Sequence, residues 1–179
     1  MAKLNEGVYE KYGVSYKTLT LTDGDFALTV TPEKGGMATS FTKAGDEYLW
    51  LRDKNFESTD RPRCGVPILF PNCGKPDGGV HHFNGADYPI ENHGLADLLP
   101  WQVKSATDEA IELTLTPNGL TKFVYPFEFC LTMRYTLAGG KAGLALTVEN
   151  KGDKEMPFCV GFHPYFAASK LENVSFDIK

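Results

Sequence analysis

Alternation of apolar and polar residues, broken at short intervals by glycine-containing turns, is the feature that most limits how this chain can fold. Residues 14–21 (VSYKTLTL) and 25–31 (DFALTVT) alternate on either side of a TDG turn, and residues 126–137 (PFEFCLTMRYTL) form the longest such segment. A period of two places successive side chains on opposite faces of a β-strand. No segment shows the period of an amphipathic helix. We therefore predict an all-β fold, an antiparallel sandwich of about eleven strands.

The size and the charge of the chain exclude several classes of protein. Its 179 residues are enough for a single domain spanning 1–179. The 18 basic and 23 acidic residues give a net charge of −5, which argues against nucleic acid or an anionic membrane as partner. We find no apolar run long enough to span a membrane and no secretory signal at the N-terminus, and we expect a cytoplasmic protein.

Residues 64–101 differ from the rest of the chain because they are rich in glycine, proline and histidine. They hold three of the four histidines and two of the four cysteines. The run VPILF (66–70) is continuously apolar and lies between a glycine and a proline, which predicts a strand buried on both faces. The sequence NHG (92–94) follows. Taken alone, the segment is compatible with a metal site, a cluster of turns or an active-site loop.

Two histidines are candidates for proton transfer, because imidazole changes its protonation state closest to neutral pH. His93 stands beside Gly94, and its alternative is a surface or capping role in a loop. His163 lies in the apolar run 158–166 (FCVGFHPYF), where burial shifts its pKa and aromatic neighbours such as Tyr165 can stack on a sugar. Its alternative is a buried histidine bonded to a backbone carbonyl. We predict that His93 and His163 meet in space and act on a sugar.

The other charged or titratable side chains admit simpler interpretations. His81 and His82 precede an Asn-Gly turn, so we predict that they are exposed at a hairpin. Arg52, Arg61 and Arg63 lie in a segment without periodicity. They either bind a phosphate or carboxylate or face solvent in a surface loop.

The four cysteines do not suggest a disulfide framework, since none of them forms a C-x-x-C pair. We interpret Cys130 and Cys159 as small buried apolar residues. An alternative is a metal site formed by Cys64, Cys73, His81 and His82. The spacing of these four residues matches no known ligand pattern, and we predict no metal.

Three motifs together carry a resemblance to a known family. They are GVPILFPNCG (65–74), NHGLADLLPW (92–101) and GFHPYF (161–166), in this order. The chain resembles the aldose 1-epimerase (mutarotase) family, whose close relatives include the hexose-6-phosphate 1-epimerases. The resemblance covers nearly the whole chain and implies the family's galactose mutarotase-like antiparallel β-supersandwich.

The resemblance also implies an activity, the interconversion of the α and β anomers of a hexose, free or phosphorylated, without a cofactor. By similarity, His163 is the acid that protonates the ring oxygen, and His93 hydrogen-bonds the same region of the sugar. A well-placed proton donor contributes about 10²–10⁴ in rate. We assign substrate contacts to Asn92, Tyr165 and Arg63.

The sequence departs from the family pattern in two places. The family's catalytic base is a glutamate near the C-terminus of a longer chain, and neither it nor the family's sugar-binding aspartate has a counterpart after His163. We therefore expect the N-terminal part of a mutarotase, incomplete at the C-terminus, with little mutarotation by residues 1–179 and more by a longer gene product. Asp97 stands where many relatives carry arginine, which argues against a sugar phosphate.

Two alternatives to an enzyme remain open. The first is a non-catalytic β-sandwich that binds carbohydrate, which needs no base. The second is a structural β-domain that self-associates through the open edge of its sheet, since unpaired strands are templates for pairing.

Overall fold

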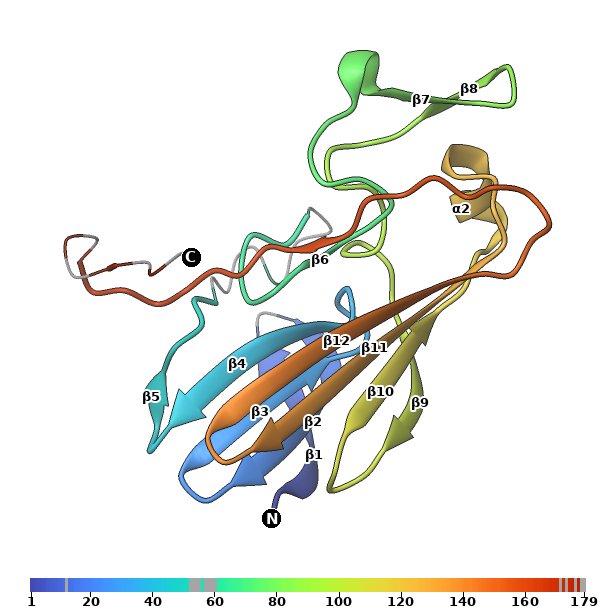
Figure 1. Cartoon of the computed structure of the whole chain (residues 1–179). Coiled ribbons are helices and arrows are strands. Elements are labelled where there is room, and N and C mark those ends of the chain that lie inside the picture. Colours follow the sequence, from blue (N-terminus) through green and yellow to red (C-terminus); the bar gives the residue numbers. More distant parts are fainter. Residues whose placement is uncertain are drawn as a thin grey trace.

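Two antiparallel sheets form the layers of a sandwich (Figure 1). The computed structural model describes residues 1–11, 13–51, 56, 61–170, 172, 174–175 and 177. The first sheet has the strand order β1-β2-β3-β4-β5 and the second the order β12-β11-β10-β9. The strands of these sheets are β1 (Lys3–Lys11), β2 (Val14–Asp23), β3 (Phe26–Thr31), β4 (Met37–Lys43), β5 (Asp46–Glu47), β9 (Gln102–Ala106), β10 (Ile111–Leu115), β11 (Phe129–Ala138) and β12 (Lys141–Asn150). The predicted all-β antiparallel sandwich is confirmed.

One hydrophobic core fills the space between the two sheets, and the alternation of β11 explains how it forms. Every second residue of this strand is buried, namely Phe129, Leu131, Met133, Tyr135 and Leu137. Burying each large apolar side chain contributes about 1.5–3 kcal/mol. The hydroxyl of Tyr135 donates a hydrogen bond to the Gly36 carbonyl (2.6 Å), which ties the second sheet to the first. Our prediction that Cys130 is buried is wrong, because it falls on the outer face of β11 and is half-buried.

The predicted strand at 66–70 is buried along its length, but only β6 (Ile68–Leu69) is regular strand. Pro67 and Pro71 interrupt the ladder because proline has no N–H to donate. β6 pairs antiparallel with β13 (Gly161–Phe162). The backbone bonds continue on both sides of this pair, from Cys159 N–H to Pro71 O (2.8 Å), from His163 N–H to Pro67 O (3.0 Å) and from Tyr165 N–H to Gly65 O (2.8 Å).

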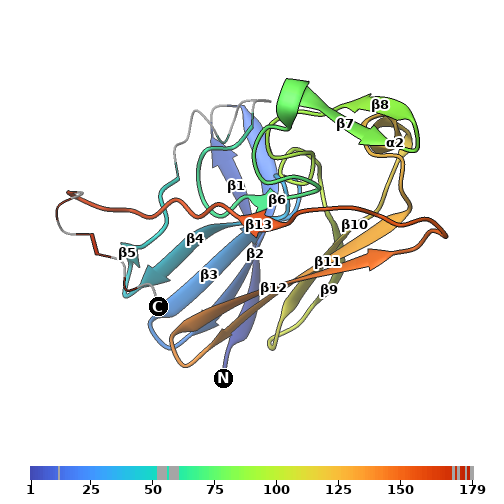
Figure 2. The same ribbon diagram turned by 45° about the horizontal axis from the view of Figure 1, so that its top comes forward.

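We call residues 157–166 the His163 strap. It runs across the molecule beside β6, above one end of the two sheets (Figures 1 and 2). Our prediction that Cys159 is buried is wrong, because this strap residue is exposed. An apolar sequence does not ensure that other parts of the chain cover it. Phe158 and Phe166 of the same run are 45% and 61% exposed.

A hairpin and a short helix complete the described chain. β7 (Val80–Phe83) and β8 (Ala86–Pro89) pair around the predicted Asn-Gly turn, after the 3₁₀ turn η1 (Asp77–Gly79). His82 is exposed as predicted, whereas His81 is half-buried. The helix α2 (Gly119–Val124) was not predicted, because six residues are too few to show a helical period. None of the helices in the described ranges has the length and apolar character needed to cross a membrane.

The described part of the chain contains thirteen strands rather than about eleven. β1 was missed because its sequence, KLNEGVYEK, is mostly polar; it pairs with β2 along its whole length. The end of the sequence, ENVSFDIK (172–179), alternates like a strand, but none of its described positions, which are 172, 174, 175 and 177, lies in a strand. β5 and β12 are edge strands, and association through an open edge stays a prediction.

Candidate active site

All five residues predicted to act on or bind a sugar line one pocket of roughly 260 Å³. They come from three separate segments of the chain. These residues are Arg63, Asn92, His93, His163 and Tyr165, and the same pocket is also lined by Arg61, Pro62, Pro67, Leu69 and Asp97.

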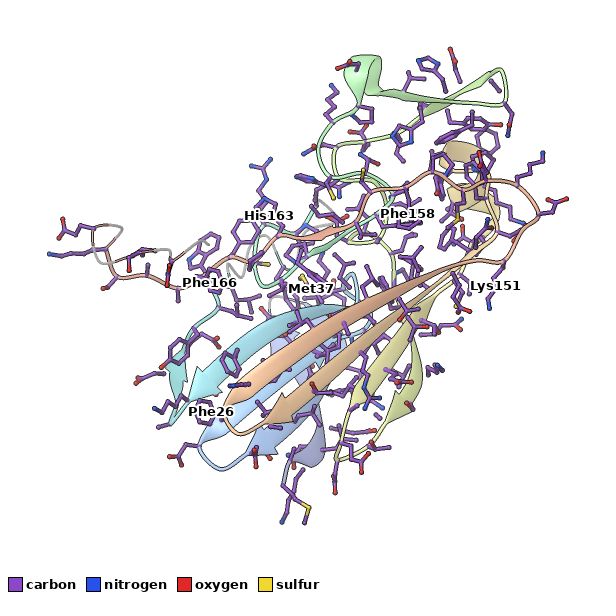
Figure 3. All side chains as sticks on the ribbon, viewed as in Figure 1. Phe26, Met37, Lys151, Phe158, His163 and Phe166 are labelled. Carbon is purple, nitrogen blue, oxygen red and sulfur yellow. The ribbon has the colours of Figure 1, made fainter. Side chains whose placement is uncertain are left out.

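The buried segment around β6 brings the two distant histidines together. On one side, it is paired with the His163 strap, which Figure 3 shows with His163 near its middle. On the other side, Phe70 pairs with Gly94, and its carbonyl accepts a hydrogen bond from Leu95 N–H (2.8 Å). As a result, the rings of His93 and His163 meet edge to face, with centroids 5.6 Å apart and planes at 74°.

Only glycine fits at position 94. Its φ is +80°, and a Cβ there would lie 2.2 Å from the Phe70 carbonyl oxygen. This close approach of two backbone segments sets the position of the preceding residue, His93. The glycine of the NHG motif is therefore required by backbone packing, whatever chemistry the site performs.

His93 is held in one orientation by a single neighbouring residue. Its φ is +67°, a region that non-glycine residues rarely adopt. Its backbone N–H donates to Gly74 O (3.0 Å), and the Gly74 N–H donates to the ring Nδ1 (3.1 Å). Because Nδ1 is an acceptor, the neutral ring carries its proton on Nε2. Burial lowers the pKa of His93, and the charges of Arg61 and His163 lower it further, so the ring is a neutral donor at neutral pH.

Aromatic contacts fix the ring of His163. It stacks on the ring of Tyr165, with centroids 4.8 Å apart and planes at 15°. Tyr165 is itself anchored, because its carbonyl accepts a hydrogen bond from Trp50 N–H (2.8 Å). Burial raises the pKa of Tyr165, so its hydroxyl remains protonated at neutral pH. The His163 ring therefore lies between the face of one aromatic ring and the edge of another.

A buried ion pair between Arg61 and Asp97 lies in the wall of the same pocket. Nη1 of Arg61 bonds Oδ1 of Asp97, and Nη2 donates to the Gly94 carbonyl (2.8 Å). The side chain of Asp97 is 1% exposed and that of Arg61 is 18% exposed. Desolvation raises the pKa of Asp97, and the Arg61 charge and hydrogen bond oppose this rise.

Sequence reasoning did not find this pair. It named Arg61 only as a candidate for anion binding in a loop, and it assigned Asp97 no partner. The two residues are 36 positions apart and neither lies in a periodic segment. The one available signal was an acidic residue inside the largely apolar sequence HGLADLLPW.

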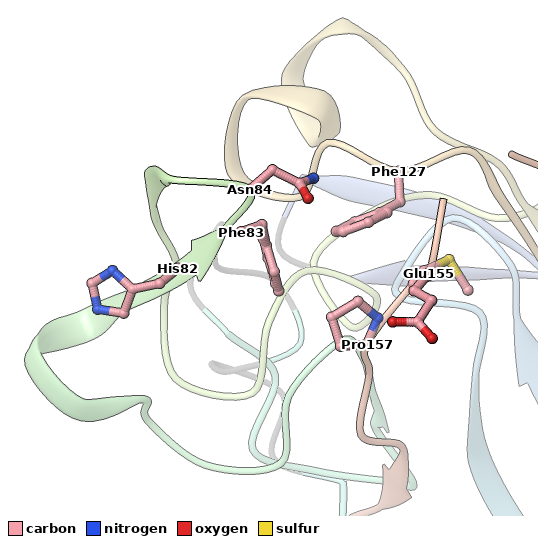
Figure 4. Close-up of a pocket in the computed structure, with 7 residues that line it drawn as sticks. His82, Phe83, Asn84, Phe127, Glu155 and Pro157 are labelled. Atoms are coloured by element: carbon pink, nitrogen blue, oxygen red, sulfur yellow. The ribbon is translucent and has the colours of Figure 1, made fainter. Parts of the chain in front are cut away.

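The remaining candidates lie elsewhere. His82 lines a different pocket of roughly 460 Å³, together with Phe83, Phe127 and Glu155 (Figure 4). Arg52 lies outside the described residues. Within the described ranges, no cluster of three or more His, Cys, Asp or Glu side chains has the arrangement of a metal site, and this includes the cysteine–histidine set considered above.

Chemically, the pocket offers several proton and hydrogen-bond donors but only one carboxylate among its described lining residues. The donors are the imidazoles of His93 and His163, the hydroxyl of Tyr165, the amide of Asn92 and the guanidinium of Arg63. Asp97 is the one carboxylate among the described residues that line it, and this group is paired with Arg61.

A family model described as aldose 1-epimerase matches residues 17–178, nearly the whole chain. The chain belongs to the aldose 1-epimerase family. This confirms the resemblance carried by the three motifs.

Relatives of the family agree with this assignment. The chromosomal LacX protein of Lactococcus lactis is 28% identical over 150 residues, which are 80% of this chain and 48% of that protein. An Escherichia coli K12 protein, named provisionally as a glucose-6-phosphate 1-epimerase, is 29% identical over 148 residues, 79% of this chain and 46% of that protein. The chain thus spans about half the length of these curated relatives.

Solved structures of the family share the fold. The Slr1438 protein of Synechocystis sp. PCC 6803 superposes with a TM-score of 0.81 at 33% identity, covering 87% of this chain and 58% of that one. A galactose mutarotase-like protein from Lactobacillus casei ATCC 334 gives a TM-score of 0.76 at 30% identity, covering 87% and 52%. The predicted galactose mutarotase-like fold is confirmed.

Proposed function

We propose that the pocket around His93 and His163 binds a hexose and that the protein interconverts its α and β anomers. The observation that carries this proposal is the edge-to-face contact of the two imidazoles, 5.6 Å apart, inside one pocket. Membership of the aldose 1-epimerase family supports an isomerase of this kind.

The two histidines have different parts in the proposed reaction. Ring opening requires a proton on the ring oxygen while a base takes the proton of the anomeric hydroxyl, so that the C1–O5 bond breaks and an aldehyde forms. Rotation about the C1–C2 bond and the reverse steps give the other anomer. His163 delivers the proton to the ring oxygen. The neutral His93 ring, held by Gly74, donates its Nε2–H to the same region and positions the sugar.

The groups around the histidines suit the hydroxyls of a sugar. Asn92 and Arg63 are exposed at the pocket and can donate to ring hydroxyls, as can the protonated Tyr165 hydroxyl. Arg61 is less available, since its guanidinium is already bonded to Asp97 and Gly94. This favours a free hexose over a sugar phosphate.

One observation favours a second candidate function, a non-catalytic carbohydrate-binding module. A base is needed for ring opening but not for binding. Among the described residues that line the pocket, the one carboxylate is Asp97, and Arg61 engages it.

The decisive experiment measures sugar binding and turnover on the same samples. The optical rotation of fresh α-glucose and α-galactose is followed with the wild-type chain, His163→Asn and His82→Asn, whose histidine is exposed on the β7–β8 hairpin. We expect a small acceleration over the buffer rate that His163→Asn abolishes, because a well-placed proton donor contributes about 10²–10⁴ in rate. Sugar affinity should change little in His163→Asn, and His82→Asn should match wild type in both measurements. Binding with decay at the buffer rate would leave the binding module as the function. An absence of binding would exclude both.

A further inference from the structure

Two exposed thiols lie beside the candidate active site. Cys73 directly follows Asn72 in the turn after β6, and Cys159 lies on the His163 strap. The two residues are far apart in the sequence, and the pairing of β6 with β13 brings their segments together. Neither thiol has a role in the proposed sugar chemistry.

The hydrogen bonds of the strap show which way its side chains face. Residues 159, 163 and 165 donate their N–H groups to residues 71, 67 and 65, and 161 pairs with 69. Alternate residues of an extended segment share a face, so Cys159, Gly161 and His163 form one row. His163 in this row lines the candidate sugar pocket.

Cys73 lies over the same row. A Cβ placed on Gly161 would be 3.0 Å from the Cys73 sulfur, so this thiol occupies the space that a side chain at position 161 would fill. Gly161 and Cys159 are two positions apart, about 7 Å along an extended chain. Burial raises the pKa of the Cys73 thiol and the charge of Cys159 raises it further, which agrees with two sulfur atoms close enough to influence each other.

Gly74, the residue after Cys73, holds His93 in place with two hydrogen bonds. Gly74 accepts the backbone hydrogen bond of His93 and donates to its ring Nδ1. The side-chain amide of Asn72, on the other side of Cys73, also donates to Gly74 O (2.6 Å). A movement of Cys73 along the strap therefore displaces the group that fixes the tautomer and orientation of His93.

We propose that Cys73 and Cys159 are a thiol oxidation site that closes to a reversible disulfide, and that closure withdraws Gly74 from His93 and disables the sugar pocket. The oxidant is a small-molecule disulfide such as oxidised glutathione. The Cys159 thiolate attacks it, one small thiol leaves, and a mixed disulfide forms. The Cys73 thiolate then attacks the Cys159 sulfur and displaces the second small thiol. In sum, two protein thiols lose two protons and two electrons, and the small disulfide is reduced to two thiols.

Bond formation is tested without reference to sugar. The 179-residue chain is incubated with oxidised glutathione, and intact-mass spectrometry under non-reducing conditions is followed by peptide mapping. We expect the loss of two hydrogen atoms and a linked peptide containing Cys73 and Cys159, reversed by dithiothreitol. Cys130→Ser should behave as wild type, because its half-buried thiol lies on β11. Cys73→Ser and Cys159→Ser should stop at a mixed disulfide. Failure of the wild-type chain to form the linked peptide overturns the inference.

The effect on the site has its own readout. We expect the imidazole nitrogen signals of His93 to shift on oxidation and to return on reduction, while those of His82 stay unchanged. A disulfide that leaves the His93 signals in place would overturn the coupling to the site. The expected loss of hexose affinity, at least about tenfold, rests on the proposed function. If the reduced chain binds no hexose, the proposed function fails while the linked peptide and the His93 shift still decide the oxidation site.

Discussion

Replacing Arg61 with alanine tests whether the wall of the pocket depends on the buried ion pair. The substitution leaves the carboxylate of Asp97, 1% exposed, without its cation, and it removes a donor from the Gly94 carbonyl. Removing one partner of a buried pair costs about 3–5 kcal/mol. Because the Arg61 side chain keeps 18% exposure, some solvent reaches the pair, and we expect the lower end, about 3 kcal/mol.

The loss of folding stability in Arg61→Ala should grow as pH rises, because the ionised form of Asp97 is the form that needs Arg61. Desolvation raises the native pKa of Asp97 above its ordinary value of 3.8, so the native state binds a proton more readily than the unfolded chain does. This contribution to stability is complete below the unfolded pKa and is lost as pH rises through the native pKa. Arg61 limits the loss, because its charge and hydrogen bond lower the native pKa. In Arg61→Ala more of this stability is lost as pH rises. The free energies of unfolding of the wild type and of Arg61→Ala should therefore differ little near about pH 4 and most near neutral pH.

Urea unfolding followed by tryptophan fluorescence is the assay. Trp101 is a suitable reporter, since it is buried and its indole N–H donates to the carbonyl of Ala96, next to Asp97. The matched control is Arg134→Ala, which removes a surface pair with Glu112 and should cost about 0–1 kcal/mol. The reasoning is refuted if Arg61→Ala is no more destabilising than the control at neutral pH, or if its cost is the same at both pH values.

Two further substitutions test the specificity of the pocket and the fit of its loop. Asp97→Asn frees the charge of Arg61. We expect the affinity for a hexose 6-phosphate, relative to the affinity for the free hexose, to rise by about tenfold in calorimetric titrations at low salt. An unchanged ratio of the two affinities would contradict the role given to the Arg61–Asp97 pair. Gly94→Ala drives a Cβ into the Phe70 carbonyl, whereas Gly45→Ala has a similar positive φ and nothing within 4 Å. We expect losses of about 3 kcal/mol or more and about 1–2 kcal/mol respectively by chemical denaturation, and equal losses would rule out the close approach as the cause.

The fold was predictable because most strands are buried on one face only. In such a strand, burial and sequence share the period of two, and in β11 every second residue from Phe129 to Leu137 is buried. The same reasoning failed for β1, whose polar sequence pairs along an edge without covering much of the core. It also failed for Cys159, since apolar neighbours in sequence do not ensure burial in space.

The meeting of His93 and His163 was predictable only from the order of three short motifs. The structure supplies the physical cause, which is that the buried segment around β6 contacts the NHG loop on one side and the His163 strap on the other. The Arg61–Asp97 pair could not be predicted in the same way. A side-chain contact between two irregular segments leaves no period in the sequence.

The central claim is that His93 and His163 form one sugar site, and the four histidines of the chain allow a direct test of it. The imidazole nitrogen signals of all four are followed by NMR while glucose or galactose is added. The account predicts that the signals of His93 and His163 move together with one dissociation constant, while those of His81 and His82, on the β7–β8 hairpin, stay in place. Sugar-dependent shifts confined to His81 and His82, or no saturable shift of any histidine, would contradict it.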